Sequence, residues 1–410
     1  MLQNEILRVY GTDYEKITFK LLEAAELASD IRKKVSGKKD IRIGIKPNLV
    51  CPTPADFGAT THPEIVEGII TYLLYNGFEA GSIVIIESSW VGDRTSEAFE
   101  YCGYNALSKK YGIALMDMQK EKAVVSSDCA GIGLNICRPA LELDYLINVP
   151  VLKGHCQTKI SCALKNMKGL IPNSEKRRFH RMGLHKPIAH LNIALKQDFI
   201  VIDHICGDPD FEEGGSPLIR NCVMAAKDPV LTDAFAAKLL GYEPYEIEYV
   251  KLAEKLGIGS ADLSGLSLRT VEGEIYDGEP ADSSCTLENA GGGNAGEAAK
   301  TLRAADPFAG VKAPELRKIV KTACAVDEID SCSACFGMLV PALERLKDEG
   351  KFERLMLKLG GGSICIGQGY KGKSGAVGIG NCTAGFDFCI KGCPPHGEDI
   401  YKGLKDFLEA

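Results

Sequence analysis

The 410-residue sequence lacks the long apolar run of a membrane-spanning helix, because no stretch approaches about 18 consecutive apolar residues. The N-terminus, MLQNEILRVYGTDYEK, carries charges where an export signal would need an apolar stretch, so we expect neither membrane insertion nor secretion. Aromatic residues are scarce at 7%, whereas hydrophobic residues reach 45%, a composition typical of a soluble α/β protein.

Neither of two common nucleotide-binding motifs has its full sequence context. One stretch, GQGYKGKS at residues 367–374, matches the pattern GxxxxGK[ST] and contains GxGxxG, but no helix is predicted directly after it, as both motifs require, so the sequence gives no support for ATP or NAD. Positive charge is not in excess either, because 48 Lys and Arg residues face 55 Asp and Glu residues, a net charge of −7. This balance excludes nucleic acid as a partner of the chain as a whole.

Cysteine, in contrast, is abundant, with 16 residues. In a chain without an export signal, this number favours thiols and metal ligands in a reducing cytoplasm over disulfides. Cys137, Cys206 and Cys222 lie in apolar stretches, and we expect them to be inert core residues.

Four cysteines near the C-terminus have the spacing of a metal site. Cys332 and Cys335 form a CxxC pair, and Cys382 and Cys393 follow singly, the last within Gly-Cys-Pro-Pro. Four thiolates can hold a [4Fe–4S] cluster or zinc. A tight pair followed by two separated single ligands is unlike a zinc ribbon, and a proline after the last ligand recurs in cluster-binding runs, so we expect a [4Fe–4S] cluster, with zinc as the alternative.

Basic residues are concentrated in the middle of the chain. Residues 153–186 contain nine Lys or Arg and one acidic residue, Glu175. A charge run of this kind is usually a solvated surface. Here, however, His, Thr, Ser, Asn and Gly residues are interleaved with the basic ones, which suits recognition of an anion such as phosphate or carboxylate.

The first half of the chain alternates apolar runs with amphipathic segments. Uninterrupted β-branched runs between helical segments indicate a mainly parallel sheet with helices on both faces, a doubly wound α/β fold. The predicted strands cover residues 41–45, 82–86, 145–151 and 199–205, and a predicted helix covers residues 62–74. In such sheets ligands bind beyond the carboxyl ends of the strands, and polar clusters follow these strands.

We expect two domains. Residues 1–280 would form the ligand-binding α/β domain, residues 281–314 a Gly- and Ala-rich linker, and residues 315–410 a smaller α/β cysteine-rich, cluster-binding domain. In the smaller domain, a strand is predicted over residues 318–323 and helices over residues 336–348 and 398–408.

Several motifs in the N-terminal ~250 residues resemble a bacterial and archaeal family catalogued as domain of unknown function 362. They are KPN (46–48), VPVLKGH (149–155), Thr158, ALKNMKG (163–169), Asp203 at a strand end and AKDPVLTD (226–233). The resemblance covers most of residues 40–260. It implies a fold but no reaction, so the function has to be inferred from the site.

The last ~95 residues are similar to the proximal-cluster module of hydrogenase small subunits, on the basis of CxxC, Gly-Asn-Cys and Gly-Cys-Pro-Pro. This resemblance implies one [4Fe–4S] centre held by Cys332, Cys335, Cys382 and Cys393 in a flavodoxin-like fold. The gap between the last two cysteines is short and contains Cys389, which is an alternative ligand. Cys324 and Cys365 are further candidates.

The sequence also suggests residues for an anion site. The substrate-binding candidates are Lys46, Asn48, Thr158, Ser161, Lys165 and Asn166, and the catalytic candidates are His155, Lys153, Asp203 and Asp228. We expect the basic residues to line one cleft, with Asp203 and Asp228 on its opposite wall as a general base or Mg²⁺ ligands. Asp228 could equally cap a helix, and Asp233 is a further candidate. Cys156 and Cys162 flank the basic motif as reactive or, more simply, structural thiols.

Three functions fit this sequence. The first is a cytoplasmic iron–sulfur oxidoreductase that passes electrons from the cluster to an anionic small molecule and takes them from a partner protein. The second is an electron carrier or maturation factor whose basic segment docks an acidic protein. The third is a lyase or isomerase with a structural cluster or zinc. The oxidoreductase predicts a deep pocket near the cysteines. The electron carrier or maturation factor predicts a shallow basic surface, and the lyase or isomerase predicts a cluster remote from the pocket.

Overall fold

The structure, a computed structural model, describes residues 1–126, 130–215, 217–272, 325–329, 331 and 333–409. Its larger unit is built on an eight-stranded sheet in the order β12-β1-β11-β10-β7-β2-β3-β4. The strands are β12 (Ser267–Thr270), β1 (Glu5–Tyr10), β11 (Cys222–Ala226), β10 (Phe199–His204), β7 (Tyr145–Val149), β2 (Ile43–Pro47), β3 (Ile83–Glu87) and β4 (Ala114–Asp117).

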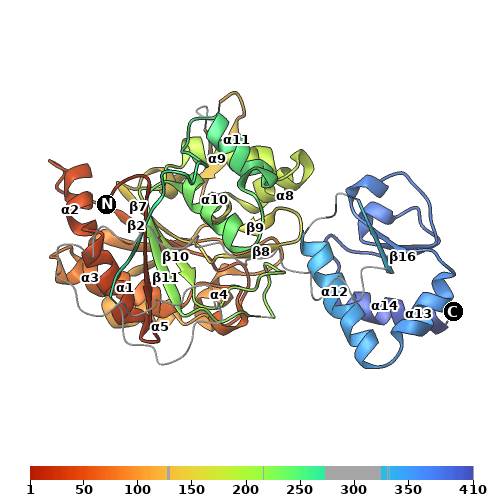
Figure 1. Ribbon diagram of the computed structural model, residues 1–410. Coiled ribbons are helices and arrows are strands. Elements are labelled where there is room, and N and C mark those ends of the chain that lie inside the picture. Colours follow the sequence, from red (N-terminus) through yellow and green to blue (C-terminus); the bar gives the residue numbers. More distant parts are fainter. Residues whose placement is uncertain (127–129, 216, 273–324, 330, 332, 410) are drawn as a thin grey trace.

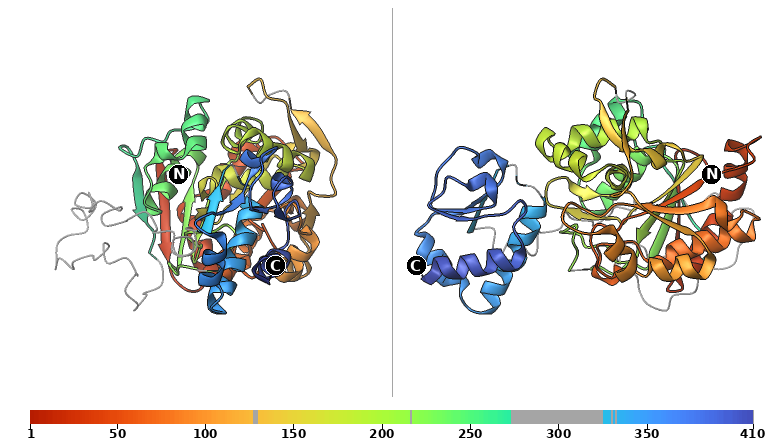
Figure 2. Two further views of the ribbon diagram at one scale, coloured as in Figure 1. Left: turned by 90° about the vertical axis from the view of Figure 1, so that its right-hand side faces the viewer. Right: turned by 180° about the vertical axis from the view of Figure 1, so that it is seen from behind.

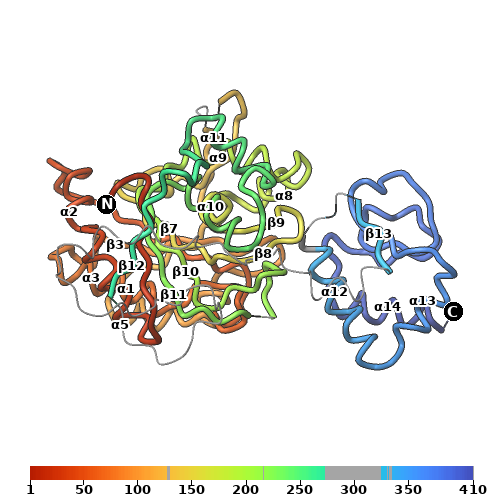
Figure 3. Tube along the Cα trace, viewed as in Figure 1, coloured from red at the N-terminus to blue at the C-terminus, as the bar shows by residue number. Residues whose placement is uncertain are grey.

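The sheet is mainly parallel, as the sequence predicts. Only β11 runs against its neighbours, β1 and β10, and all other pairs in this sheet are parallel. Strands β1 and β11 are far apart in the sequence but lie side by side in the sheet (Figure 3). Neither was recognised in the sequence, because the pairing of β1 with β11 joins residues more than 200 positions apart.

Helices cover both faces of the sheet, as the alternation of buried side chains along β10 shows. Ile200 and Ile202 face one apolar core, whereas Phe199 and Val201 face the other. In Figure 1 the helices gather in two groups on opposite sides of the strands. The first group contains α1 (Tyr14–Ala24), α2 (Leu27–Lys34), α3 (Pro63–Tyr75), α4 (Thr95–Tyr101) and α5 (Tyr104–Tyr111), and the second α7 (Ala163–Asn166), α8 (Asn173–Met182), α9 (His185–Ala194), α10 (Pro229–Leu239) and α11 (Glu248–Lys255).

The strand order reverses between β2 and β7. From β2 the chain continues to β3 and β4 on one side, and then returns to β7 and β10 on the other side. Loops that leave the carboxyl ends of such neighbouring strands diverge and open a crevice, which is where ligands bind in open α/β sheets. The motifs that follow β2, β3 and β7 therefore lie at the crevice of this fold.

The smaller unit contains a four-stranded, fully parallel sheet. Its strands are β13 (Val326–Glu328), β14 (Ile364–Ile366), β15 (Val377–Ile379) and β16 (Phe388–Ile390), and its helices are α12 (Ser333–Asp348), α13 (Phe352–Leu359) and α14 (Gly397–Glu409). Figure 2 shows this unit, in blue, beside the larger one. The predicted helices 336–348 and 398–408 fall within α12 and α14. The predicted linker and the strand over residues 318–323 lie outside the described residues.

The two units contact each other. Phe211 of the larger unit packs into the apolar core of the smaller one. The side-chain amide of Gln368 donates a hydrogen bond of 3.0 Å to the backbone oxygen of His180 in α8. Among the residues that the structure describes, no helix is both long and apolar enough to cross a bilayer.

Candidate functional site

A cavity of about 550 Å³ lies between the carboxyl edge of the large sheet and the smaller unit. From the larger unit it is lined by Lys46, Asn48, Val50, Glu87, Ser88, Trp90, Val91, Ser161, Lys165, Asn166, Lys168, Gly169, Ser174, Lys176, Arg177, His180, Arg181 and Glu212. From the smaller unit it is lined by Cys335, Gln368, Lys371, Asn381, Cys382, Cys393 and Pro394. The cavity therefore combines polar groups of one unit with thiols of the other.

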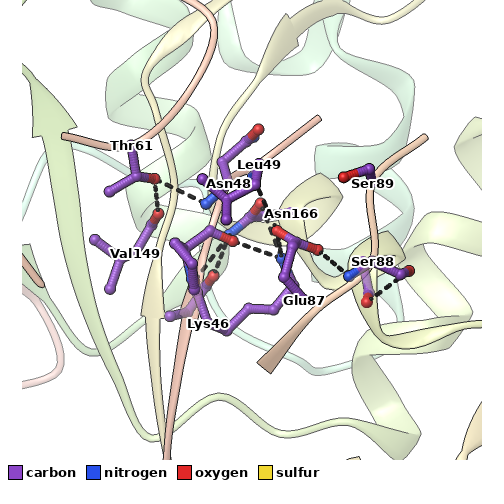
Figure 4. Close-up of polar contacts among 12 residues, drawn as sticks. Lys46, Asn48, Leu49, Thr61, Glu87, Ser88, Ser89, Val149 and Asn166 are labelled. Atoms are coloured by element: carbon purple, nitrogen blue, oxygen red, sulfur yellow. Dashed lines mark hydrogen bonds and ion pairs between the residues drawn. The ribbon is translucent and has the colours of Figure 1, made fainter. Parts of the chain in front are cut away.

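A buried ion pair between Lys46 and Glu87 lies at the ends of the adjacent strands β2 and β3 (Figure 4). Lys46 Nζ is 2.6 Å from Glu87 Oε2 and also donates to the Pro47 oxygen at 2.7 Å. Glu87 in turn accepts the backbone N–H groups of Leu49 and Ser88. Burial lowers the pKa of Lys46, and Glu87 opposes this effect. The carboxylate is thus held by one ammonium and two backbone donors.

Gly169, in the 3-10 turn η3 (Met167–Leu170), allows this pair to form. A Cβ atom at Gly169 would lie 1.9 Å from Glu87 Oε1 and 2.5 Å from Lys46 Nζ. Asn166, one turn earlier, places its side-chain oxygen 3.4 Å from Lys46 Nζ and donates to Asn148 Oδ1 at 2.7 Å. The KPN and ALKNMKG motifs therefore meet at one point, although about 120 residues separate them.

Lys176, on α8, is the second buried lysine that lines the cavity. Its Nζ donates to the Ser88 backbone oxygen at 2.9 Å, to Ser88 Oγ at 2.6 Å and to the Ser89 backbone oxygen. No carboxylate is among these partners. Burial lowers the pKa of Lys176 to about 7, so its charge changes near neutral pH.

Lys165, Glu212 and His155 form a third buried group. Glu212 Oε2 accepts from Lys165 Nζ at 2.9 Å and faces His155 Nε2. His155 Nδ1 accepts the backbone N–H groups of Gln157 and Thr158, at 3.0 and 3.1 Å, so the ring proton is on Nε2. Burial lowers the pKa of His155 to about 3, so the ring is neutral. His155 therefore orients Glu212 and does not face the cavity.

Lys153 and Thr158 also lie outside the lining of the cavity. Lys153 Nζ is buried and donates to the backbone oxygens of Ala59 and Glu212 and to Asn48 Oδ1, and burial lowers its pKa to about 8. Thr158 Oγ1 donates to the Ile160 oxygen within the hairpin of β8 (Lys153–His155) and β9 (Lys159–Ser161). The substrate-binding candidates that do line the cavity are Lys46, Asn48, Ser161, Lys165 and Asn166.

The two aspartates expected on the opposite wall are occupied elsewhere. Asp203 accepts hydrogen bonds from the ring and the backbone of His62. Asp228 caps α10, where Oδ1 accepts the N–H groups of Val230 and Leu231. The sequence predicts that both carboxylates face the lysines, and the described structure differs. Asp203 is hydrogen-bonded to His62, and Asp228 is hydrogen-bonded to the backbone at the start of α10.

Asp233 lies on α10, one turn beyond Asp228, and is buried. It accepts the backbone N–H groups of Ala163 and Leu164 at the start of α7. Burial raises the pKa of Asp233 to about 7. Asp233 thereby holds the start of the ALKNMKG segment and does not line the cavity.

Three of the predicted cluster ligands share one wall of the cavity. Cys335 comes from the first turn of α12, Cys382 from the turn after β15, and Cys393 from the loop after β16. A Cβ atom on Gly380, whose φ is +83°, would lie 3.7 Å from Cys335 Sγ, so the turn that carries Cys382 passes close to Cys335. Burial raises the pKa of Cys382, and the Cys393 thiol adds to this effect.

The alternative ligands are placed differently. Cys389 Sγ lies 3.5 Å from Thr383 Oγ1 and 3.6 Å from the Gly380 oxygen, and Cys365 Sγ lies 3.8 Å from the Ser363 oxygen. Neither cysteine lines the cavity. Cys332 and Cys324 lie outside the described residues.

The donor chemistry of the cavity wall suits an iron–sulfur cluster, because thiolates are the usual ligands of such clusters. Within the described ranges, however, no three His, Cys, Asp or Glu side chains gather closely enough to hold a single metal ion. Cys332 lies outside these ranges. The agreement between the cavity and a cluster site therefore depends on the thiols of Cys335, Cys382 and Cys393, which line the same cavity.

Some cavity residues were not singled out from the sequence. Arg177 and Arg181 belong to the basic segment, and Glu87 follows a predicted strand. Neither the charge run nor the position after a strand distinguished these residues from their neighbours. Lys371 lies in the glycine-rich stretch 367–374 of the other unit, which the sequence did not connect with the basic segment. Its place in the cavity depends on how the two units pack.

Comparisons with known proteins match part of the chain. The chain is 24% identical over 226 residues to the thylakoid-associated protein sll1697 of Synechocystis sp., a match that covers 53% of this chain and 68% of that protein. The lactate racemase apoprotein of Thermoanaerobacterium thermosaccharolyticum aligns with 62% of this chain and 57% of its own, at 15% identity and a TM-score of 0.35. Residues 43–238, which hold most of the large sheet and the basic segment, match the family described as "Domain of unknown function (DUF362)".

Proposed function

We propose that the protein is an iron–sulfur redox enzyme that binds an anionic small molecule in the cavity. One observation carries the proposal: cysteine thiols of the smaller unit and Lys and Arg side chains of the larger unit line the same space. A [4Fe–4S] cluster held by Cys332, Cys335, Cys382 and Cys393 would supply single electrons there. Reduced cysteines and a cytoplasmic location belong to the same proposal.

The charges of the cavity support an anionic ligand. Seven Lys or Arg side chains and two Glu side chains line it. Each Glu is already held by a lysine, in the Lys46–Glu87 and Lys165–Glu212 pairs. Among the described ion pairs, none includes Arg177 or Arg181, and both side chains are exposed. These two arginines can therefore bind a phosphate or carboxylate without breaking an internal pair.

The shape of the site favours an enzyme over an electron carrier. A carrier that docks an acidic protein would present a shallow basic surface, whereas a cavity of about 550 Å³ has the size of a small-molecule site. A lyase or isomerase with a structural cluster would not need its thiols at the substrate. Here Cys335, Cys382 and Cys393 line the cavity itself.

Anion binding beside the thiols tests the proposal. Anaerobically reconstituted protein, reduced with dithionite, should show a saturable change in its electron paramagnetic resonance spectrum when titrated with inorganic phosphate or malonate. Replacing Arg177 and Arg181 together with Gln should weaken this binding about tenfold or more, because each arginine supplies a charge-assisted hydrogen bond.

The matched control is Lys186→Gln, which removes one exposed charge of the same basic segment outside the cavity and should bind as the wild type does. The proposal fails if neither anion gives a saturable change in a protein that carries the cluster. It also fails if the control weakens binding as much as the double variant.

Lys176 should make anion binding depend on pH. Because its pKa is about 7, the side chain is charged below pH 7 and loses its charge as the pH rises. Sulfate affinity should therefore fall about tenfold between pH 6 and pH 8 if only the charged form binds. Calorimetric titrations with sulfate, which does not itself titrate in this range, measure this. Lys176→Met should bind sulfate weakly at both pH values, and an unchanged pH profile in a folded variant would exclude Lys176 as the titrating group.

A further inference from the structure

A cysteine, a histidine and an aspartate form a relay at the carboxyl end of β10, outside the cavity. Cys206 Sγ lies 3.7 Å from His62 Nε2, and His62 Nδ1 lies 2.8 Å from Asp203 Oδ2. Asp203 belongs to β10, Cys206 follows that strand, and His62 precedes α3. A sulfur, a base and a group that orients the base are the parts of an activated nucleophile.

The fold holds this relay in place. Asp203 is fully buried, and its carboxylate also accepts the backbone N–H groups of His62 and Ile205, at 2.9 and 3.0 Å. The same carboxylate therefore fixes the backbone and the ring of His62. Because Nδ1 faces Asp203, Nε2 is directed toward Cys206.

The charges around His62 favour its protonated form. Burial lowers the pKa of His62, but Asp203 and Cys206 outweigh burial and raise it to about 11. The other titratable groups that face the ring are Asp56, at 3.6 Å from Nε2, and Tyr14, in edge contact at 5.4 Å between ring centroids. A cysteine attacks an electrophile as the thiolate, and an adjacent imidazolium stabilises the negative charge of the attacking sulfur.

The relay lies just below the surface. Cys206 and His62 are each only 4% exposed, yet the Asp56 side chain beside His62 is 93% exposed. The 3-10 turn η1 (Ala55–Phe57) is part of its cover, since Cys206 Sγ lies 3.4 Å from the Ala55 oxygen.

We propose that Cys206, His62 and Asp203 form a second reactive site, in which Cys206 is a nucleophile toward small uncharged electrophiles. This assignment replaces the expectation that Cys206 is an inert core thiol, and it uses none of the residues that line the cavity. With iodoacetamide as the probe, the sulfur forms a bond to the methylene carbon while the carbon–iodine bond breaks. Iodide leaves with the bonding pair, and His62 keeps its proton.

The test is site-resolved alkylation of the full-length protein, followed by peptide mass spectrometry. Cys51 is an internal control of similar exposure, at 8%, and burial raises its pKa to about 11. At pH 7 Cys206 should react with iodoacetamide about tenfold or more faster than Cys51. Iodoacetate should react more slowly than iodoacetamide, because the Asp56 and Asp203 carboxylates repel it.

Two variants complete the test. His62→Gln should lower the rate at Cys206 about tenfold at pH 7, because the attacking sulfur loses the positive charge beside it. Because His62 is buried, Asp56→Asn tests the same site from the surface without a change in the core, and it should increase the iodoacetate rate relative to iodoacetamide. The proposal is overturned if Cys206 reacts no faster than Cys51 in the native protein, or if the Asp56 variant leaves the ratio of the two rates unchanged.

Discussion

Serine in place of Cys382 or Cys393 should abolish assembly of the cluster. Both thiols line the cavity wall, and a serine hydroxyl is a poor substitute for a thiolate ligand of iron. After anaerobic reconstitution, we expect the wild type to contain about four iron and four sulfide per chain. Each serine variant should lose most of its iron, sulfide and visible absorbance.

Cys389→Ser is the matched control for this experiment. Cys389 lies in strand β16, between Cys382 and Cys393 in the sequence, and its sulfur is close to Thr383 Oγ1 and the Gly380 oxygen, so its replacement should leave the iron content unchanged. Loss of iron in the Cys389 variant, with iron retained in the Cys382 variant, would show that Cys389 is the ligand. One zinc per chain, without sulfide, would identify a zinc site and refute the redox function.

Glu87→Gln should destabilise the larger unit by about 3–5 kcal/mol, because it leaves the buried Lys46 ammonium without a counter-charge. The substitution keeps the size of the side chain, so lost packing contributes little. Urea unfolding of the reconstituted protein, followed by circular dichroism, measures the change in free energy.

Two further variants separate the charge effect from other effects. Glu97→Gln removes an exposed carboxylate paired with Arg94 and should change stability by about 0.5 kcal/mol or less. Replacing Lys46 with Met in the Glu87→Gln background removes the unpaired ammonium and should recover part of the lost stability. If Glu87→Gln lowers the free energy of unfolding no more than Glu97→Gln does, the Lys46–Glu87 pair does not stabilise the larger unit.

Local sequence patterns predicted most of the scaffold. The apolar runs that became β2, β3, β7 and β10 are buried on both faces of a parallel sheet, and such strands need no polar alternation. The edge at which the site lies followed from the same reasoning, because polar motifs come directly after these strands. Strands β1 and β11 were missed, since their pairing depends on residues more than 200 positions apart.

The orientation of each polar side chain was not predictable from these patterns. Lys46 and Lys153 both follow predicted strands, yet Lys46 lines the cavity, whereas Lys153 donates to the Ala59 and Glu212 oxygens and does not line it. Asp228 caps a helix, and Asp203 holds His62. Competing hydrogen-bond partners decide these outcomes, and most of those partners are distant in the sequence.

The sequence by itself determined a mainly parallel α/β sheet, a basic segment at its carboxyl edge and a cysteine set near the C-terminus, because each is a pattern of neighbouring residues. Only the tertiary structure decided that Cys335, Cys382 and Cys393 share a cavity with Lys46, Lys165 and the arginines of α8. It alone brought Cys206 beside His62. These juxtapositions arise from packing between segments more than 100 residues apart, and no local periodicity encodes such contacts.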